Sequence, residues 1–196
     1  MITIVVEGLV DEAAARKLCE RSGLSVGNVY GLKGKHHLDS KLGAYNEAAR
    51  FAPWIVFRDL DHDADCAPSL CDRLLPDRTS LMYLRIAVHA TEAWLLADHH
   101  GISHYLGVPI TIIPSSPDAL DAPKRDLVNL ARKSKQRSIR NDMVPAPGRS
   151  GDVGTGYTAR MIDFISEHWN PDRASAHSDS LRRCIEALNA LAKRYS

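Results

Sequence analysis

The feature that most constrains the fold is the alternation of short β-branched segments with helix-patterned segments over roughly the first hundred residues. Apolar runs typical of strands lie at residues 1–8 (MITIVVEG), 24–30 (LSVGNVY), 54–57 (WIVF) and 80–88 (SLMYLRIAV). Helical spacing is predicted for residues 11–23, 44–52, 69–77 and 91–105, and a polar, glycine-broken loop for residues 31–43. Strands that alternate with helices need crossover connections, which favour parallel strands. We therefore expect an α/β, Rossmann-like fold: a mainly parallel sheet with helices on both faces.

The second half of the chain has a different character. Residues 107–124 are rich in proline and serine and read as a connection, and residues 144–156 as a mobile glycine-rich loop. Helical spacing returns at residues 124–135, and two helices are expected to close the chain. We expect a core over residues 1–110 and a C-terminal helical extension over residues 111–196, packed together as one compact domain. The amphipathic last helix is expected either to cover the sheet or to pair with a second copy in a homodimer.

Composition narrows the classes of protein. The chain of 196 residues has a net charge of +1, so nucleic-acid binding would have to come from a local basic cluster. No signal peptide and no apolar run of membrane-span length is present, which predicts a soluble, cytoplasmic protein without membrane contact. The four cysteines are expected to be reduced thiols. The nearest zinc pattern, His62, Cys66 and Cys71, lacks a Cys-x-x-Cys pair and a nearby fourth ligand.

Acidic residues stand at the ends of two predicted strands. Glu7 ends the first, and Asp59 and Asp61 end the strand at residues 54–57. Ligands of open parallel sheets bind at the carboxyl edge, so three carboxylates would converge there if these strands are neighbours. Residues two apart in an extended strand point to the same side, so Asp59 and Asp61 are expected to share one ion. Oxygen ligands without sulfur favour Mg²⁺ or Mn²⁺.

These residues carry a resemblance to a known family. "VVEGLVDE" followed by "IVFRDLDHD" resembles the Toprim domain, the metal-binding fold of topoisomerases, bacterial primases and OLD-type nucleases. Glu7–Gly8 and Asp59–Leu60–Asp61 match its pattern of a glutamate ending one strand and an Asp-x-Asp pair ending a later one. The wider chain resembles an uncharacterised bacterial Toprim-like family with relatives in phage-defence neighbourhoods. The resemblance implies that Asp59 and Asp61 ligate a divalent ion and that Glu7 ligates it or acts as a general acid or base.

Two further residues are candidates for the site. Glu92 lies in "AVHATEAWLLAD", an apolar helix that would bury it or face it into a cleft, and the alternative is a partner such as Arg85 at the edge of the core. Lys124 in "DAPK" could bind phosphate, and the alternative is an ordinary solvated lysine. Residues 124–140 hold seven basic residues against one acid, which fits contact with a phosphate backbone. The alternative is a solvated helix face.

The leading functional hypothesis is a metal-dependent phosphodiester-processing hydrolase, a nuclease in bacterial defence or nucleic-acid maintenance. A second hypothesis is a non-catalytic Toprim-like subunit that works with a separately encoded ATPase, since the chain has no phosphate-binding loop of its own. A third is a metal-dependent phosphatase of the haloacid-dehalogenase type, whose Asp-x-Asp usually continues to Thr or Val where Asp63 stands here. Calcium sensing is poorly supported, because Ala64 and Leu70 occupy the EF-hand glycine and glutamate positions.

Overall fold

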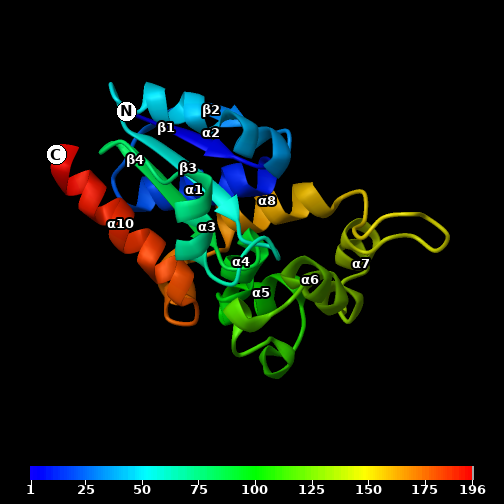
Figure 1. Ribbon diagram of the computed structural model, residues 1–196. Helices are drawn as coiled ribbons and strands as arrows, with labels where there is room; N and C mark the ends of the chain where they lie inside the picture. The colour runs from blue at the N-terminus through cyan, green and yellow to red at the C-terminus, as the bar shows by residue number, and fades with distance from the viewer. Residues whose placement is uncertain (196) are drawn as a thin grey trace.

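A computed structural model describes residues 1–195 as a parallel sheet covered by helices (Figure 1). The strands are β1 (Ile2–Val6), β2 (Val26–Gly31), β3 (Trp54–Asp59) and β4 (Met82–Ala87), in the spatial order β2-β1-β3-β4. Every neighbouring pair is parallel. The predicted α/β, Rossmann-like class and the placement of all four strands are therefore confirmed.

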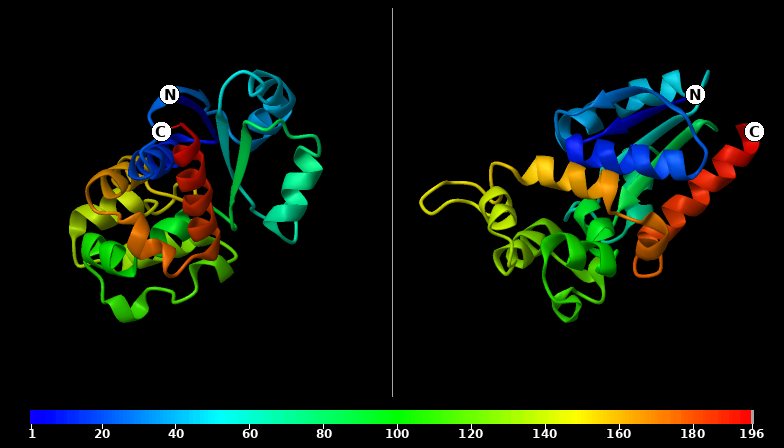
Figure 2. Two further views of the ribbon diagram at one scale, coloured as in Figure 1. Left: turned by 90° about the vertical axis from the view of Figure 1, so that its left-hand side faces the viewer. Right: turned by 180° about the vertical axis from the view of Figure 1, so that it is seen from behind.

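Helices cover both faces of the sheet. The elements that follow the strands are α1 (Leu9–Arg21), α2 (Lys35–Ala48), α3 (Ala67–Leu74), α4 (Thr91–Leu96) and α5 (His99–Leu106). The C-terminal half adds two short 3₁₀ turns (Ile110–Ile112 and Pro117–Ala119), α6 (Pro123–Arg132), α7 (Arg137–Met143), α8 (Tyr157–Glu167), α9 (Pro171–Ser175) and α10 (Asp179–Tyr195). One face is covered by α2 and α3, and the other by α1, α8 and α10 (Figure 2).

The strand periodicity explains how the core divides. Ile4 of β1 and Ile55 of β3 face the larger cluster under α1 and α10, whereas Val5 and Val56 face the smaller cluster under α2 and α3. Alternation of apolar side chains to both faces is expected of a strand buried on both sides. The larger cluster draws residues from β1 through to α10, so the helical extension completes the core of the sheet.

Helix α10 covers the sheet, which was one of the two expectations for it. Leu181, Ile185, Leu188 and Leu191 are buried along one side of the helix. The helix contacts β4 and α1. Its apolar side therefore belongs to the core of the chain that carries it. None of the helices in residues 1–195 is long and apolar enough to span a membrane.

The expectation of a loop at residues 31–43 was wrong. Helix α2 begins at Lys35, directly after Gly34 with its positive φ of 78°, and continues through Gly43. Leu38 and Leu42, one turn apart, are buried against β1 and β3. Burial of two leucines outweighs the roughly 1 kcal/mol that a glycine costs inside a helix.

The helix expected over residues 91–105 is interrupted. Helix α4 ends at Leu96 and α5 begins at His99, with Asp98 as the N-cap whose side chain accepts a hydrogen bond from the Gly101 N–H. The Asp98 carboxylate is fully buried and is held by Arg173 at 2.8 Å. A third short helix, α9, carries that arginine, so three helices, rather than the two expected, follow residue 156 in the described chain.

Candidate metal and phosphate site

The two strands that end in acids lie side by side at the centre of the sheet. Because β2 pairs with one edge of β1 and β3 with the other, the strand order reverses between β1 and β3. Crevices at the carboxyl ends of such strands are the usual ligand sites of open α/β sheets. Glu7 directly follows β1 and Asp59 is the last residue of β3. The expectation that these strands are neighbours is confirmed.

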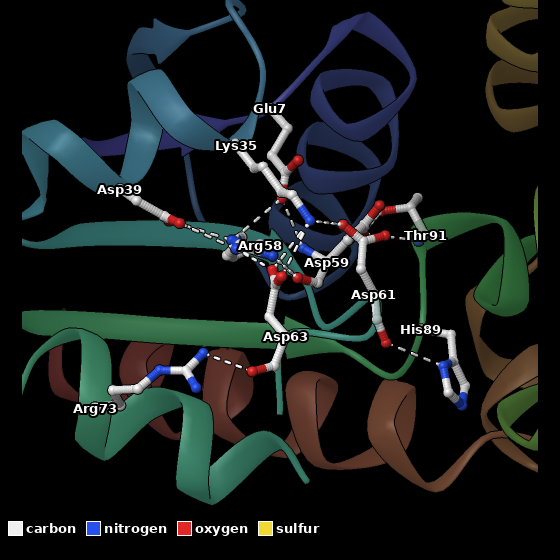
Figure 3. A network of polar contacts seen from close by, with 10 residues as sticks. All are labelled: Glu7, Lys35, Asp39, Arg58, Asp59, Asp61, Asp63, Arg73, His89 and Thr91. Atoms are coloured by element: carbon white, nitrogen blue, oxygen red, sulfur yellow. Dashed lines mark hydrogen bonds and ion pairs between the residues drawn. The ribbon is translucent and has the colours of Figure 1, made fainter. Parts of the chain in front are cut away.

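Glu7 and Asp59 are in direct contact. Oε1 of Glu7 accepts a hydrogen bond of 2.9 Å from the Asp59 N–H (Figure 3). Burial raises the pKa of Glu7 to about 7, although this hydrogen bond and the charge of Arg58, 3.6 Å from the same oxygen, act in the opposite direction. Glu7 is therefore poised to gain or lose a proton near neutral pH.

Asp59 is the most deeply placed acid of the site. Its Oδ1 accepts hydrogen bonds from the N–H of Thr91 at 2.9 Å and from the Thr91 hydroxyl at 3.2 Å. Burial raises the pKa of Asp59 well above its ordinary range, and the neighbouring charges of Asp11, Glu92 and Glu7 act in the same direction. A buried carboxylate among other carboxylates is costly unless protons or a cation compensate it.

Asp11 joins this cluster, although the sequence pattern did not mark it as a site residue. It lies one helical turn after Glu7, in the first turn of α1. Burial raises the pKa of Asp11 to about 6, with Glu92 acting in the same direction and Thr91 and Lys124 in the opposite one. The signal in the sequence was the four-residue spacing of Glu7 and Asp11 across a strand-to-helix turn.

Glu92 and Lys124 meet on the same side of the site. Helix α4 is buried all round, as predicted, and Oε1 of Glu92 lies 3.2 Å from Nζ of Lys124. The Tyr157 hydroxyl donates a 3.1 Å hydrogen bond to the same oxygen. Glu92 raises the pKa of Lys124, while burial and then Glu92 raise the pKa of Tyr157. The partner of Glu92 is therefore Lys124, and the side chain of the alternative partner, Arg85, makes no hydrogen bond or ion pair among the described residues.

The expectation that Asp59 and Asp61 belong to one extended strand was wrong. Strand β3 ends at Asp59, and Asp61 has a left-handed φ of 46°, so period-two alternation does not set the direction of its side chain. The charge of Asp61 nevertheless acts on both Glu7 and Asp59 and raises their pKa values. Oδ2 of Asp61 lies 2.7 Å from Nζ of Lys35, at the start of α2 (Figure 3). The N–H of Asp61 is bonded to the carbonyl of His89, which explains how the turn is held.

A second ionic group supports the strand end from the other face. The buried Arg58 guanidinium pairs with Asp39 at 3.0 Å and with Asp63 at 2.5 Å, and it also donates to the Asp59 carbonyl (Figure 3). Burial alone would lower the pKa of Arg58, but Asp39 and Asp63 outweigh it and raise that pKa. Arg58 therefore has a structural role at the end of β3. Asp63 forms ion pairs with both Arg58 and Lys35.

When its acids are ionised, the site holds more negative charge than its own cations balance. Glu7, Asp11, Asp59 and Glu92 lie together, while Lys124 pairs with Glu92 alone and Arg58 is shared with Asp39 and Asp63. A divalent cation with oxygen ligands fits such a surplus. Within residues 1–195, no three acidic, histidine or cysteine side chains are already arranged to hold a metal ion.

Basic residues lead away from the site along α6 and α7. Lys124 lies in the first turn of α6, and the helix contacts α4, which carries Glu92. Beyond it, exposed basic side chains follow at Arg125, Arg132, Lys133, Lys135 and Arg137. Arg132 and Arg140 line a cavity of about 410 Å³ at the far end of this segment. A basic segment therefore starts at the carboxylate cluster and extends outward from it.

Sequence reasoning missed Asp11, Thr91 and Tyr157 as neighbours of the predicted site. Thr91 had one usable signal, its place at a helix N-terminus directly before Glu92. Tyr157 had none, because its position depends on how α8 packs.

No protein-family model, curated protein or solved structure matches this chain.

Proposed function

We propose that this protein is a Mg²⁺- or Mn²⁺-dependent phosphodiester hydrolase, a nuclease. The observation that carries the proposal is the convergence of Glu7, Asp11, Asp59 and Glu92 at the β1–β3 switch point, with Lys124 beside them. Such a set of oxygen ligands suits a hard divalent cation that keeps room for a phosphate. The resemblance of the Glu7 and Asp59–Leu60–Asp61 segments to the Toprim pattern supports the same reaction class.

The residues that would hold the ion are Glu7, Asp11 and Asp59, with Asp61 joining them if it leaves Lys35. A divalent cation, when bound, orients the phosphate, offsets charge in the transition state and lowers the pKa of a bound water. The carboxylates that ligate it must be unprotonated, so binding displaces the protons that burial favours on them. The raised pKa values are thus a property of the ion-free cluster.

Lys124 is suited to stabilise negative charge on the phosphate. Its side chain is 54% exposed, whereas the carboxylate of Glu92 that anchors it is 3% exposed. Glu92 fixes the position of the ammonium group, and Tyr157 fixes Glu92 in turn. A fixed cation beside the reacting phosphate stabilises the transition state without reorganising at the moment of reaction.

Only one of the two carboxylate oxygens of Glu7, Oε1, makes the contacts described above. Both of its contacts, with the Asp59 N–H and with Arg58, are made by Oε1. Oε2 is therefore available to ligate the ion or to transfer a proton to or from the attacking or leaving oxygen. Glu7→Gln separates these two roles, because loss of a ligand weakens ion binding, whereas loss of proton transfer lowers kcat alone.

The nucleic-acid part of the proposal rests on the basic segment. The exposed cations of α6 and α7 begin at Lys124 and would contact a phosphate backbone that enters the site. If the substrate follows this segment, cleavage should weaken steeply with salt. Replacing Arg125 and Arg132 with glutamine should raise KM and reduce that salt dependence while leaving ion binding unchanged.

The deciding experiment measures ion binding and cleavage on the same samples. Wild type, Asp59→Ala, Glu7→Gln and the control Asp65→Ala are titrated with Mn²⁺ by calorimetry and incubated with labelled single-stranded DNA, duplex DNA and RNA. Asp65 is an exposed acid from the same acidic run, with no ion pair in the structure. We expect Mn²⁺-dependent cleavage by wild type and the control, and at least about a hundredfold loss in Asp59→Ala.

Three outcomes would count against the proposal. No Mn²⁺ binding would remove its basis. Cleavage of p-nitrophenyl phosphate without cleavage of nucleic acid would replace the nuclease with a phosphatase. Ion binding without any turnover would favour a non-catalytic subunit that depends on a partner such as a separately encoded ATPase.

A further inference from the structure

β4 is one of the two edge strands of the sheet, and its outer side has backbone groups available for pairing. Strand β4 lies last in the order and pairs with β3 alone. The carbonyls of Leu81 and Ala87 accept hydrogen bonds from the neighbouring strand and the residue that follows it. Because successive carbonyls of a strand point to opposite sides, the N–H and C=O groups of the intervening Leu84 and Ile86 point away from β3.

A cavity lies against this edge. It has a volume of about 700 Å³ and is lined by Leu84 and Ile86 from β4, by Cys71 from α3 and by Cys184 from α10. Helices α3 and α10 stand on opposite faces of the sheet, and the left view of Figure 2 shows them on either side of β4. The edge strand therefore forms the floor of a groove with a helix on each side.

The groove contains an unpaired cation. Arg85 lines the cavity; within residues 1–195 its side chain makes no hydrogen bond or ion pair, and its Nε is buried without a partner. The other two arginines of the lining are paired, Arg78 with Asp72 and Arg183 with Asp179. A buried guanidinium nitrogen without an acceptor costs free energy, which an incoming carboxylate would recover.

The two sides of the groove differ in chemistry. Along β4 the side chains of Leu84 and Ile86 face the α3 side, whereas Tyr83 and Ala87 pack with the cluster under α10. Arg85 stands between Tyr83 and Ala87 and therefore belongs to the α10 side. A strand laid beside β4 would meet apolar side chains on one face and a guanidinium on the other.

We propose that β4 accepts an extended segment of a partner protein as a fifth strand, with apolar side chains toward α3 alternating with an acidic side chain opposite Arg85. Backbone hydrogen bonds to Leu84 and Ile86 supply affinity, and the alternation supplies specificity. The docking site is on a different strand from the carboxylate cluster, so it does not depend on the hydrolase activity.

A second copy of this chain fits the groove less well. Its own β4 is flanked by α3 and α10, so pairing of two copies through β4 would also bring these helices against the helices of the first copy. A single extended segment carries no flanking helices that would hinder its approach. The edge is thus suited to a peptide strand and protected from self-pairing.

The test uses fluorescein-labelled heptapeptides that alternate valine with glutamate or valine with lysine. Fluorescence anisotropy with the full chain should show saturable binding of the glutamate peptide and at least roughly tenfold weaker binding of the lysine peptide. Arg85→Gln should weaken the glutamate peptide about tenfold, and Arg85→Glu should reverse the preference. Arg50→Gln, which alters an exposed arginine outside the groove that is paired with Glu47, should bind like wild type.

Two measurements address the backbone contacts directly. A glutamate peptide N-methylated at alternate residues on its pairing edge should lose binding, and this control leaves the protein unchanged. Amide hydrogen exchange of Leu84 and Ile86 should slow when the unmodified peptide is added. Equal binding of the methylated peptide, unchanged exchange at both amides, or competition by free glutamate at the same concentration as the peptide would each overturn the proposal.

Discussion

The carboxylate cluster should make the ion-free protein less stable as the pH rises, and Glu7→Gln isolates the contribution of one group. Glutamine keeps the oxygen that accepts the Asp59 N–H but never carries a charge. The fold raises the pKa of Glu7 from 4.5 to about 7, chiefly through burial. The stabilising contribution of protonated Glu7 is therefore fully present below about pH 4.5 and is lost as the pH rises toward about 7.

The size of the effect follows from that shift. A pKa raised from 4.5 to about 7 corresponds to about 3 kcal/mol of unfolding free energy lost by wild type at pH values above both. Glu7→Gln should therefore be about 3 kcal/mol more stable than wild type at about pH 8 and equal to it near pH 4. For a chain of this length, 3 kcal/mol is a difference of roughly 6–12 °C in Tm.

The assay is urea denaturation of both proteins in a chelating buffer at several pH values, followed by circular dichroism. Asp11 and Asp59 titrate in both proteins, so the difference between the two curves reports the ionisation of Glu7 together with its coupling to these two acids. Glu20→Gln, an exposed glutamate of α1, is the control and should stay within about 0.5 kcal/mol of wild type. Added Mg²⁺ should reduce the difference in unfolding free energy between the two proteins, because a bound cation offsets the charge of Glu7.

Either of two results would refute the reasoning. An equal difference in unfolding free energy between Glu7→Gln and wild type at pH 4 and pH 8 would mean that the variant acts through packing and not through ionisation. Wild type more stable than Glu7→Gln at about pH 8 in chelator would mean that charged Glu7 is already compensated by its neighbours in the ion-free protein.

Three further predictions concern the charges around the site and one structural ion pair. Mn²⁺ affinity should rise with pH up to about 7, because binding displaces protons from Glu7 and Asp11, and calorimetry in buffers of different ionisation enthalpy should detect their release. Lys35→Gln should strengthen Mn²⁺ binding several-fold, because it removes the ammonium group 2.7 Å from Asp61, and unchanged affinity would exclude Asp61 as a ligand. Asp98→Ala should lower the free energy of unfolding by about 3 kcal/mol in urea denaturation, because it leaves buried N–H donors and Arg173 without their acceptor. Asp98→Asn should retain part of that stability.

Much of the fold could be predicted from local pattern. The four β-branched runs became the four strands, and their alternation with helices required the parallel sheet. Glu7 and Asp59 could be placed at one edge because parallel strands end on the same side of a sheet. These conclusions depend on residues near each other in sequence and on general rules of connection.

Local pattern was insufficient where long-range packing outweighed it. Glycine-rich residues 31–43 form most of α2 because Leu38 and Leu42 pack on the sheet, and the helix after β4 breaks at Asp98 because Arg173 from α9 holds that carboxylate. Strand periodicity also failed beyond the last paired residue. Asp61 follows a left-handed turn, and its orientation comes from His89 and Lys35.

The sequence by itself determined that acids would gather at the end of the first and third strands. Only the tertiary structure decided which acids share an environment and which have cations of their own. Asp59, Asp11 and Glu7 are desolvated together by α1 and α4, which raises their pKa values, whereas Asp61 and Asp63 are neutralised by Lys35 and Arg58. The physical reason is that burial and pairing depend on which helices pack over the sheet edge, and residues distant in sequence supply those helices.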